Sequence, residues 1–220
     1  MKWRSKKSME LFAYLLINRG RSVPKVRILE DIFLEMPLKN AEAYLHTAVY
    51  QLRKELLQHG FKEMVISVQE QYRVDLNQAD VDFIQFEQGV EELSEINAVN
   101  EAAAIELEKQ FAGELFEDKS FAWAAGERER LTILYVSFAR RLASWLLDRK
   151  RLGEALQIAR RIVSRNEFDE ESNLLLLNIF GAMGDRRSLH NYYERYTQLM
   201  LRELSLKPSP AVQQLYEQYQ

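Results

Sequence analysis

The feature that most constrains this chain is the spacing of its apolar residues, which recur three and four positions apart along most of its length. One short stretch departs from that spacing, with an apolar run at residues 65–68, a polar turn at 69–71 and a second run at 72–76. In the second run Tyr72, Val74 and Leu76 alternate with polar residues, which is the period of a half-buried strand. No strand signal follows residue 82. The pattern therefore predicts a mainly α-helical fold with a single short β-hairpin.

Three short helices are predicted before the hairpin. The first covers residues 7–18 and stops at Gly20, and the second begins near Pro24 and ends before Pro37. The third is expected to run from an N-cap at Asn40 to residue 59. Three helices followed by a hairpin within residues 1–78 are the layout of a winged helix-turn-helix.

The remainder, residues 79–220, is predicted to be all-α. Helices are expected near 82–93, 100–111, 121–149, 153–165, 169–183, 185–204 and 209–219. Similar residues recur 33 positions apart, a period that suits tetratricopeptide-like helix pairs. A generic helical bundle is the alternative. The matched pairs are Leu142 with Leu175, Leu146 with Ile179, Leu156 with Leu189, Ala159 with Tyr192 and Val163 with Tyr196.

The distribution of charged residues also changes close to the predicted domain boundary at residue 78. Residues 1–75 hold 13 Lys and Arg against 9 Asp and Glu, whereas residues 76–220 hold 17 against 24. Lys2, Arg4, Lys6 and Lys7 make the start of the chain especially basic. A basic front on an acidic body suggests an anionic partner for the N-terminal third.

Composition excludes several other classes. Because the chain has no Cys, it has no disulfides, no Cys-based zinc site and no thiol nucleophile. Its longest apolar run, at 12–17, is far too short to span a membrane, and the first residues do not form a signal peptide, so a cytoplasmic protein is expected. The three His (46, 59 and 190) lack metal-ligand spacing, and no phosphate-binding Gly-rich loop occurs. We therefore expect no catalytic residues, no metal and no cofactor.

The third helix has the composition of a DNA reader. Leu45, Val49, Leu52 and Leu56 define one buried stripe. Gln can pair with adenine, Arg with guanine or phosphate, and a Thr methyl can contact thymine. A solvated amphipathic helix would look similar, and that alternative stays open here. The residues on the other faces are His46, Thr47, Tyr50, Gln51, Arg53 and Lys54.

Two segments of the N-terminal third resemble a known family. Residues 45–56, followed by Ile66, Val68, Tyr72 and Val74, resemble the recognition helix and wing of OmpR-type winged-helix domains. Residues 3–16 are similar to the first helix of the antibiotic-regulatory-protein (SARP) type of transcriptional activator and of related response regulators. The second half is similar to the bacterial transcriptional activator domain of that family at 121–124, 127–131, 184–186 and 203–210.

The resemblance implies a set of DNA contacts. The recognition helix would present His46, Thr47, Tyr50 and Gln51 to the major groove, with Arg53 and Lys54 nearer the backbone. The wing would bring Gln69, Gln71 and Arg73 to the minor groove, and Lys6 and Lys7 complete the expected set. Family wings commonly carry Gly where this chain has Gln71, so the geometry of the wing turn is expected to differ. The family's N-terminal β-sheet has no counterpart before residue 7, so either the chain is a fragment or the sheet is absent, and no segment of this sequence corresponds to the receiver domain of response regulators.

The resulting hypothesis is a sequence-specific DNA-binding transcriptional regulator, and more specifically an activator or the output part of a two-component phosphorelay. Residues 1–78 would bind promoter DNA and residues 79–220 would form the activator domain. Expected partners are double-stranded promoter DNA, a second copy of the chain on that DNA, and RNA polymerase or another transcription protein. The alternative is a tetratricopeptide-like interaction scaffold whose winged helix binds protein rather than DNA.

Overall fold

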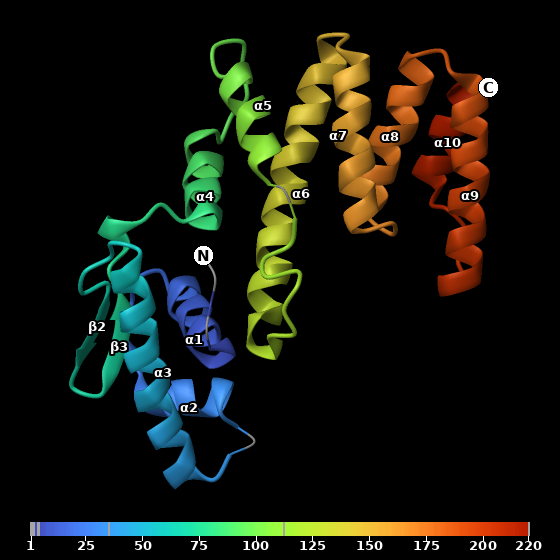
Figure 1. Ribbon diagram of the computed structural model, residues 1–220. Helices are drawn as coiled ribbons and strands as arrows, with labels where there is room; N and C mark the ends of the chain where they lie inside the picture. The colour runs from blue at the N-terminus through green and yellow to red at the C-terminus, as the bar shows by residue number, and fades with distance from the viewer. Residues whose placement is uncertain (1–2, 4, 35, 112, 220) are drawn as a thin grey trace. The chain divides into compact units, whose positions relative to one another are not determined.

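The computed structural model describes residues 3, 5–34, 36–111 and 113–219 (Figure 1). Lys2 and Arg4 of the basic start lie outside these residues. The strands are β1 (Val23–Pro24), β2 (Val65–Val68) and β3 (Gln71–Val74). The helices in the described part are α1 (Lys6–Ile17), α2 (Lys25–Ile32), α3 (Leu38–Gln58), α4 (Asp82–Glu92), α5 (Glu101–Gln110), α6 (Ala125–Asp148), α7 (Leu152–Arg165), α8 (Glu170–Ala182), α9 (Arg186–Leu204) and α10 (Pro210–Tyr219). The predicted fold class, a winged helix followed by an all-α tetratricopeptide-like part, is confirmed.

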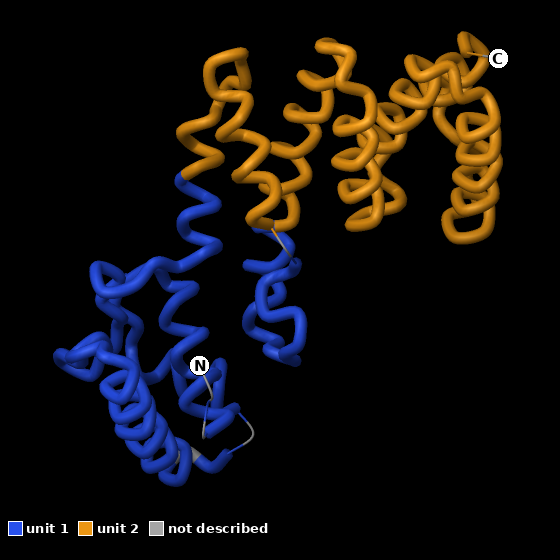
Figure 2. The backbone as a smooth tube through the Cα atoms, turned by 45° about the horizontal axis from the view of Figure 1, so that its top comes forward, with its two compact units in different colours: residues 1–88, 113–131 blue, residues 89–112, 132–220 orange. Residues whose placement is uncertain are grey.

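The chain divides into two compact units (Figure 2). Unit 1 consists of residues 1–88 and 113–131, and unit 2 of residues 89–112 and 132–220. The boundary predicted from sequence, at residue 78, stays a prediction about functional segments. The compact units do not follow that boundary, because residues 113–131 belong to unit 1 together with residues 1–88.

The core of unit 1 forms where α1 and α3 pack against each other and against the sheet. Leu11 and Leu15 of α1 and Leu45 and Leu52 of α3 are fully buried in one cluster. Burying a Leu side chain stabilises a fold by about 1.5–3 kcal/mol, so this stripe fixes which face of α3 stays exposed. Ser5 caps the start of α1, and its hydroxyl accepts a hydrogen bond from the Ser8 amide.

The predicted start of the third helix is wrong. Helix α3 begins at Leu38 after Pro37, and Asn40 lies within its first turn. The Pro37 carbonyl accepts hydrogen bonds from the amides of Asn40 and Ala41 at 2.9 and 3.0 Å. Pro37 fixes its own φ and presents its carbonyl to the next turn, so the helix starts without a side-chain cap.

The predicted hairpin is present, but it is one part of a three-stranded antiparallel sheet in the order β1-β3-β2. β1 pairs Val23 with Tyr72 and was not predicted. The turn comprises only Gln69 and Glu70, whose φ angles are 48° and 59°, rather than residues 69–71. Gln71 belongs to β3 and pairs with Val68, so it occupies a regular strand position where no Gly is required. The predicted strand also ends earlier, at Val74, because residues 76–78 form a 3₁₀ turn.

Residues 113–131 contribute an aromatic contact and an ion cluster to unit 1. The Trp123 ring packs edge-on against Tyr14 of α1 at 5.0 Å between ring centroids, and its Nε1 donates to Glu10 at 3.2 Å. Arg19, just after α1, donates to both carboxylate oxygens of Glu87 on α4 and also pairs with Glu127 on α6. The winged helix is thus packed against Trp123 and Glu127, which follow residue 78 by 45 and 49 positions in the sequence.

In unit 2, α8 packs against α7, α9 and α10. The residues matched at the 33-residue offset are buried or half-buried, with Leu142, Leu146 and Ile179 fully inaccessible. Asp169 caps α8 by accepting from the Ser172 amide, and Asp185 caps α9 by accepting from the Ser188 amide. Within the described residues, no helix has the length and apolarity that a bilayer-crossing segment needs.

Candidate nucleic-acid interface

The exposed face of α3 carries the residues predicted to read DNA. His46, Thr47 and Tyr50 are exposed, Tyr50 with 63% of its surface accessible, and Gln51 is half-buried. The Thr47 hydroxyl donates to the Ala43 carbonyl at 2.9 Å, so its methyl group is the part left for outside contacts. No acidic residue occurs between Ala43 and Lys54. The face combines hydrogen-bonding side chains with a positive charge at one end.

Arg53 and Lys54 lie at that end, and both are exposed. The Arg53 guanidinium donates to the Val65 carbonyl at 3.1 and 3.0 Å and to the Ser67 hydroxyl at 2.9 Å. It therefore connects α3 to β2, the first strand of the hairpin. Within the described part of the chain, no hydrogen bond or ion pair holds the Lys54 ammonium. The Lys54 side chain can therefore reach an outside anion, whereas the Arg53 guanidinium is held against β2.

The hairpin places the three predicted wing residues as follows. Gln71 and Arg73 lie on the same face of β3 because Tyr72 and Val74, which alternate with them, point into the core. Arg73 pairs across the strands with Ile66. Gln69 lies in the turn itself and is exposed. Figure 1 shows the hairpin running alongside α3, which brings the two groups of residues into one region of unit 1.

Lys25 holds the hairpin turn and was missed by the sequence analysis. Its ammonium pairs with Glu70 in the turn at 2.8 Å and with Glu42 near the start of α3 at 3.2 Å. Its amide also donates to the Glu70 carbonyl at 2.8 Å. The hydrogen bond to Glu70 and then that to Glu42 raise the pKa of Lys25. Lys25 and Glu70 are 45 positions apart, so no local sequence pattern could predict this pairing.

The two lysines at the chain start differ in their surroundings. Lys6 is exposed. Lys7 donates to the Glu10 carboxylate at 2.8 Å and to the Ile32 carbonyl at 2.7 Å, and its ammonium lies 5.2 Å from the centroid of the Phe33 ring. The Lys7 ammonium is therefore bound to groups of unit 1, whereas the Lys6 side chain is exposed to solvent.

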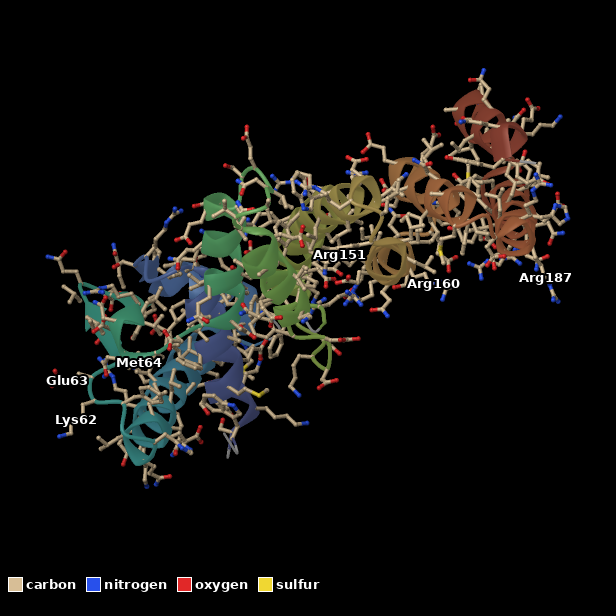
Figure 3. All side chains as sticks on the ribbon, turned by 90° about the horizontal axis from the view of Figure 1, so that it is seen from above. Lys62, Glu63, Met64, Arg151, Arg160 and Arg187 are labelled. Atoms are coloured by element: carbon tan, nitrogen blue, oxygen red, sulfur yellow. The ribbon has the colours of Figure 1, made fainter. Side chains whose placement is uncertain are left out.

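Two further exposed residues belong to this region. Tyr44 is 55% accessible and precedes Thr47 by three positions, so the helical period alone could have placed it on the reading face. Lys62 lies between α3 and β2 and extends away from the unit (Figure 3). Among the described residues no group of three or more His, Asp or Glu side chains is arranged to hold a metal ion.

Comparisons with known proteins agree with this architecture. Residues 3–71 match the family described as "Transcriptional regulatory protein, C terminal". Residues 81–220, more than half of the chain, match the family described as "Bacterial transcriptional activator domain". No curated protein matches.

A solved structure shares the fold. The structure of Mycobacterium tuberculosis EmbR in complex with a low affinity phosphopeptide aligns with a TM-score of 0.73 at 18% sequence identity. The alignment covers 100% of this chain and 60% of the EmbR chain, so this chain spans less than two thirds of that protein. At this identity the likeness concerns the fold. On the strength of the two family matches in this order, the chain belongs to the SARP-type family of transcriptional regulators, in which a winged helix precedes a bacterial transcriptional activator domain.

Proposed function

We propose that this chain is a sequence-specific, double-stranded-DNA-binding transcriptional activator that reads promoter DNA with α3 and the β2–β3 hairpin. The observation that carries the proposal is the row of Thr47, Tyr50 and Gln51 on α3, the first two exposed and Gln51 half-buried, next to a hairpin that Arg53 fastens to the same helix. The Gln51 amide and the Tyr50 hydroxyl can form directional bonds to base edges in the major groove, and the Thr47 methyl can contact a thymine methyl. The fastened hairpin gives the protein a second contact at a fixed distance from the first.

The proposed contacts fall into two kinds. His46, Thr47, Tyr50 and Gln51 read bases, and Lys54, Lys6, Gln69, Gln71 and Arg73 contact the sugar-phosphate backbone or the minor groove. Arg53 positions the hairpin. Lys7, which was expected among the contacts, supports the fold of α1 through Glu10 and Ile32.

The remaining parts of the proposal concern the whole protein. Residues 1–78 serve as the DNA-binding domain and residues 79–220 as the activator domain. Two copies bind neighbouring half-sites, and the helical part contacts RNA polymerase or another transcription protein. The protein acts in the cytoplasm and catalyses no reaction. A link to a two-component phosphorelay would run through a receiver domain on this or another chain.

The experiment is a fluorescence-anisotropy titration of a labelled random duplex with the full chain at several salt concentrations, followed by selection of preferred sequences. Each phosphate contact adds about 0.9 to the slope of log affinity against log salt. Lys54→Ala should weaken binding to all duplexes alike and lower that slope by about 1. Lys109→Ala, an exposed Lys on α5, is the matched control and should leave the slope unchanged.

Base reading is tested separately. Thr47→Ala combined with Gln51→Ala should remove discrimination of about 1–3 kcal/mol per lost base contact while leaving binding to random duplex nearly intact. Unchanged sequence preference in this variant would contradict the reading role of α3. Absence of binding even at low salt would instead favour the scaffold interpretation, in which the winged helix binds protein.

A further inference from the structure

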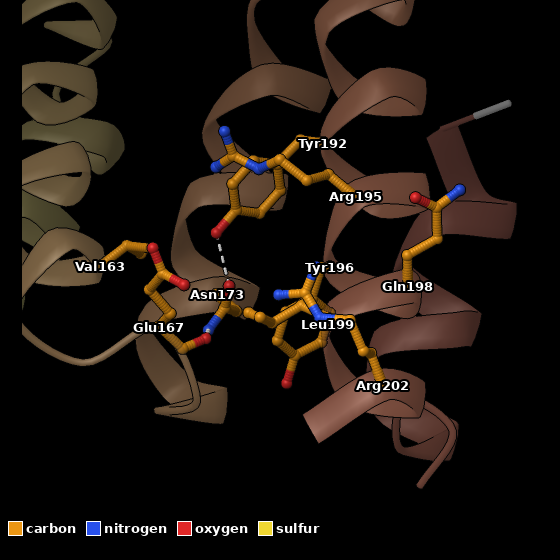
Figure 4. A pocket seen from close by; sticks show the side chains of 9 residues that line it. All are labelled: Val163, Glu167, Asn173, Tyr192, Arg195, Tyr196, Gln198, Leu199 and Arg202. Atoms are coloured by element: carbon orange, nitrogen blue, oxygen red, sulfur yellow. Dashed lines mark hydrogen bonds between the residues drawn. The ribbon is translucent and has the colours of Figure 1, made fainter. Parts of the chain in front are cut away.

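A groove runs along unit 2 between α7 and α9, with α8 at its base. Two neighbouring cavities of about 280 and 490 Å³ form it, and they share Val163, Glu167, Tyr192 and Arg195. Figure 4 shows the first of them, where the Tyr192 hydroxyl is hydrogen-bonded to Asn173 of α8 beneath the opening. This bond holds the ring of Tyr192 as a fixed wall of the groove.

Two arginines lie over aromatic rings of this groove. The guanidinium carbon of Arg195 lies 5.3 Å from the centroid of the Tyr192 ring, and that of Arg160 lies 5.9 Å from the centroid of Phe180. Both arginines are exposed. Stacking on a ring orients the plane of a guanidinium while its N–H groups at the edge remain available to an acceptor.

These two arginines differ from others of unit 2 in their lack of an ion pair with a described carboxylate, and Arg160 only adds to the lowering of the Asp185 pKa that hydrogen bonds from Ser188 chiefly cause. In the same unit Arg140, Arg151 and Arg161 each form ion pairs with Asp or Glu. Neither Arg160 nor Arg195 forms such a pair with a described carboxylate. The only acidic side chain that lines both cavities is Glu167. The groove therefore presents these two arginines against one carboxylate, a net positive charge in a segment, residues 76–220, that is acidic as a whole.

The groove also offers apolar surface. Leu199 and Val163 line the first cavity and Leu176 and Phe180 the second. Phe168, which follows Glu167 in the sequence, is 40% accessible. An occupant that fits both features has carboxylates for the guanidiniums and bulky apolar side chains for the recess. A DNA duplex has the negative charge but no apolar side chains, and its phosphates lie on a wide cylinder that a recess of this size cannot admit.

We propose that the α7–α9 groove binds an acidic peptide segment that also carries bulky apolar residues, with Arg160 and Arg195 as its charge-recognising side chains. Guanidinium–carboxylate pairs are directional and form two parallel hydrogen bonds, so they give specificity for carboxylates over amides. The inference rests on the proposed role of the helical part in contacting another protein, and it names the surface and the chemistry of that partner.

The test uses the full chain and a labelled synthetic peptide in which Glu alternates with Leu and Phe. A companion peptide has every Glu replaced by Gln. We expect the Glu peptide to bind at least about tenfold more tightly than the Gln peptide, because the charge-assisted bonds are lost in the latter. Equal affinity for the two peptides would overturn the proposal.

Variants locate the binding site. Arg160→Glu combined with Arg195→Glu should abolish binding of the Glu peptide. Arg149→Glu is the matched control, because Arg149 is also exposed and stacks on an aromatic ring, Trp145, at 4.4 Å but does not line the groove. An equal loss in the control would show that the peptide responds only to overall charge. Glu167→Gln should tighten binding, a change of opposite sign that disruption of the fold would not produce, and unchanged or weaker binding in this variant would contradict the groove site.

The same variants separate this inference from the proposed function. Each is titrated in parallel with labelled duplex, and the groove variants should bind DNA as the unmodified chain does. Loss of peptide binding with DNA binding retained supports the groove. Failure of the unmodified chain to bind duplex would overturn the DNA-binding proposal and leave the peptide result to be judged alone. Competition between duplex and peptide for Arg160 and Arg195 would identify the groove as a nucleic-acid surface and overturn the inference.

Discussion

At the scale of single residues, the buried carboxylate of Glu108 affects the pKa of the side chain next to it. Glu108 of α5 is only 2% exposed. Its carboxylate accepts a hydrogen bond from the Tyr135 hydroxyl at 2.8 Å and forms an ion pair with Arg161 at 2.5 Å. A buried carboxylate is tolerated when its oxygens are paired and hydrogen-bonded. The pKa of Tyr135, which donates to Glu108, is raised to about 12, chiefly by burial and then by the negative charge of Glu108.

The stability of the protein should therefore fall in alkali. Because the pKa of Tyr135 is higher in the fold than in the unfolded chain, its contribution is complete below pH of about 10 and is lost as the pH rises through about 12. Urea unfolding across this range checks the prediction. Tyr135→Phe should reduce the dependence of the unfolding free energy on pH, and an unchanged dependence would show that other groups dominate.

A substitution at Arg53 can test whether this residue positions the hairpin or contacts a DNA phosphate. Arg53→Lys keeps the charge but loses the pair of bonds to the Val65 carbonyl and Ser67 hydroxyl. We expect faster hydrogen exchange in β2 and a loss of stability of about 1 kcal/mol, accompanied by weaker DNA binding. Lys54→Arg, one position later, is the control. Normal exchange in β2 of the Arg53 variant would mean that the guanidinium does not hold the hairpin.

At the scale of elements, the hairpin turn is the most constrained. Gln69 and Glu70 both adopt left-handed φ angles, 48° and 59°, which favour Gly or Asn over Gln and Glu. The turn persists because Val68 pairs with Gln71 on one side and Lys25 pairs with Glu70 on the other. Local preference is thus overridden by contacts from β3 and α2.

Relieving this strain should stabilise the hairpin. Gln69→Gly should raise the free energy of unfolding by about 0.5–1 kcal/mol, because Gly adopts a positive φ without steric conflict. Ser67→Gly, within β2, is the control and should destabilise instead. A stability loss for Gln69→Gly, measured by denaturant unfolding, would indicate that the Gln69 side chain contributes a contact of its own.

The helices were predictable because their apolar residues repeat at the helical period and Gly or Pro residues end them. The observed bounds of α1, α7, α9 and α10 differ from the predictions by a few residues at most. β1 could not be predicted, since the two residues Val23 and Pro24 are too few to show alternation. The start of α3 was misplaced because a side-chain cap was sought at Asn40 where the Pro37 carbonyl serves.

The exposed reading face of α3 followed from the position of its buried stripe, so Thr47 and Gln51 could be chosen from sequence. Their role in DNA recognition stays a prediction. The partners of Arg53 and Lys25 could not be chosen, because those bonds join residues 12 to 45 positions apart. Such pairings depend on tertiary packing rather than on any local period.

At the scale of the whole molecule, unit 1 is assembled from two separate stretches of sequence. The match to the activator domain begins at residue 81, yet Trp123 and Glu127 from within it pack against α1 and Arg19. The Arg19–Glu87–Glu127–Arg130 cluster is largely shielded at its carboxylates, whose side chains are 13% and 16% exposed. Burial, followed by repulsion from Arg19, lowers the pKa of Arg130.

Removing the returning segment's main contact should loosen the winged helix. Trp123→Ala deletes the ring packed on Tyr14 and the bond to Glu10, and should accelerate hydrogen exchange in α1 and lower stability by about 2 kcal/mol. Trp145→Ala alters unit 2, where Trp145 donates to Glu101, and serves as the control. Equal protection of α1 in both variants would contradict the packing role of Trp123.

The discontinuity of unit 1 also constrains how such a protein can evolve. A single recombination event just after the hairpin would join the α1 of one relative to the Trp123 segment of another. The offspring would inherit Glu10 and Tyr14 without the aromatic residue shaped to meet them. We therefore expect positions 10, 14 and 123 to be inherited together, and chimeric regulators to keep their ancestral stability only when residues 113–131 travel with the winged helix.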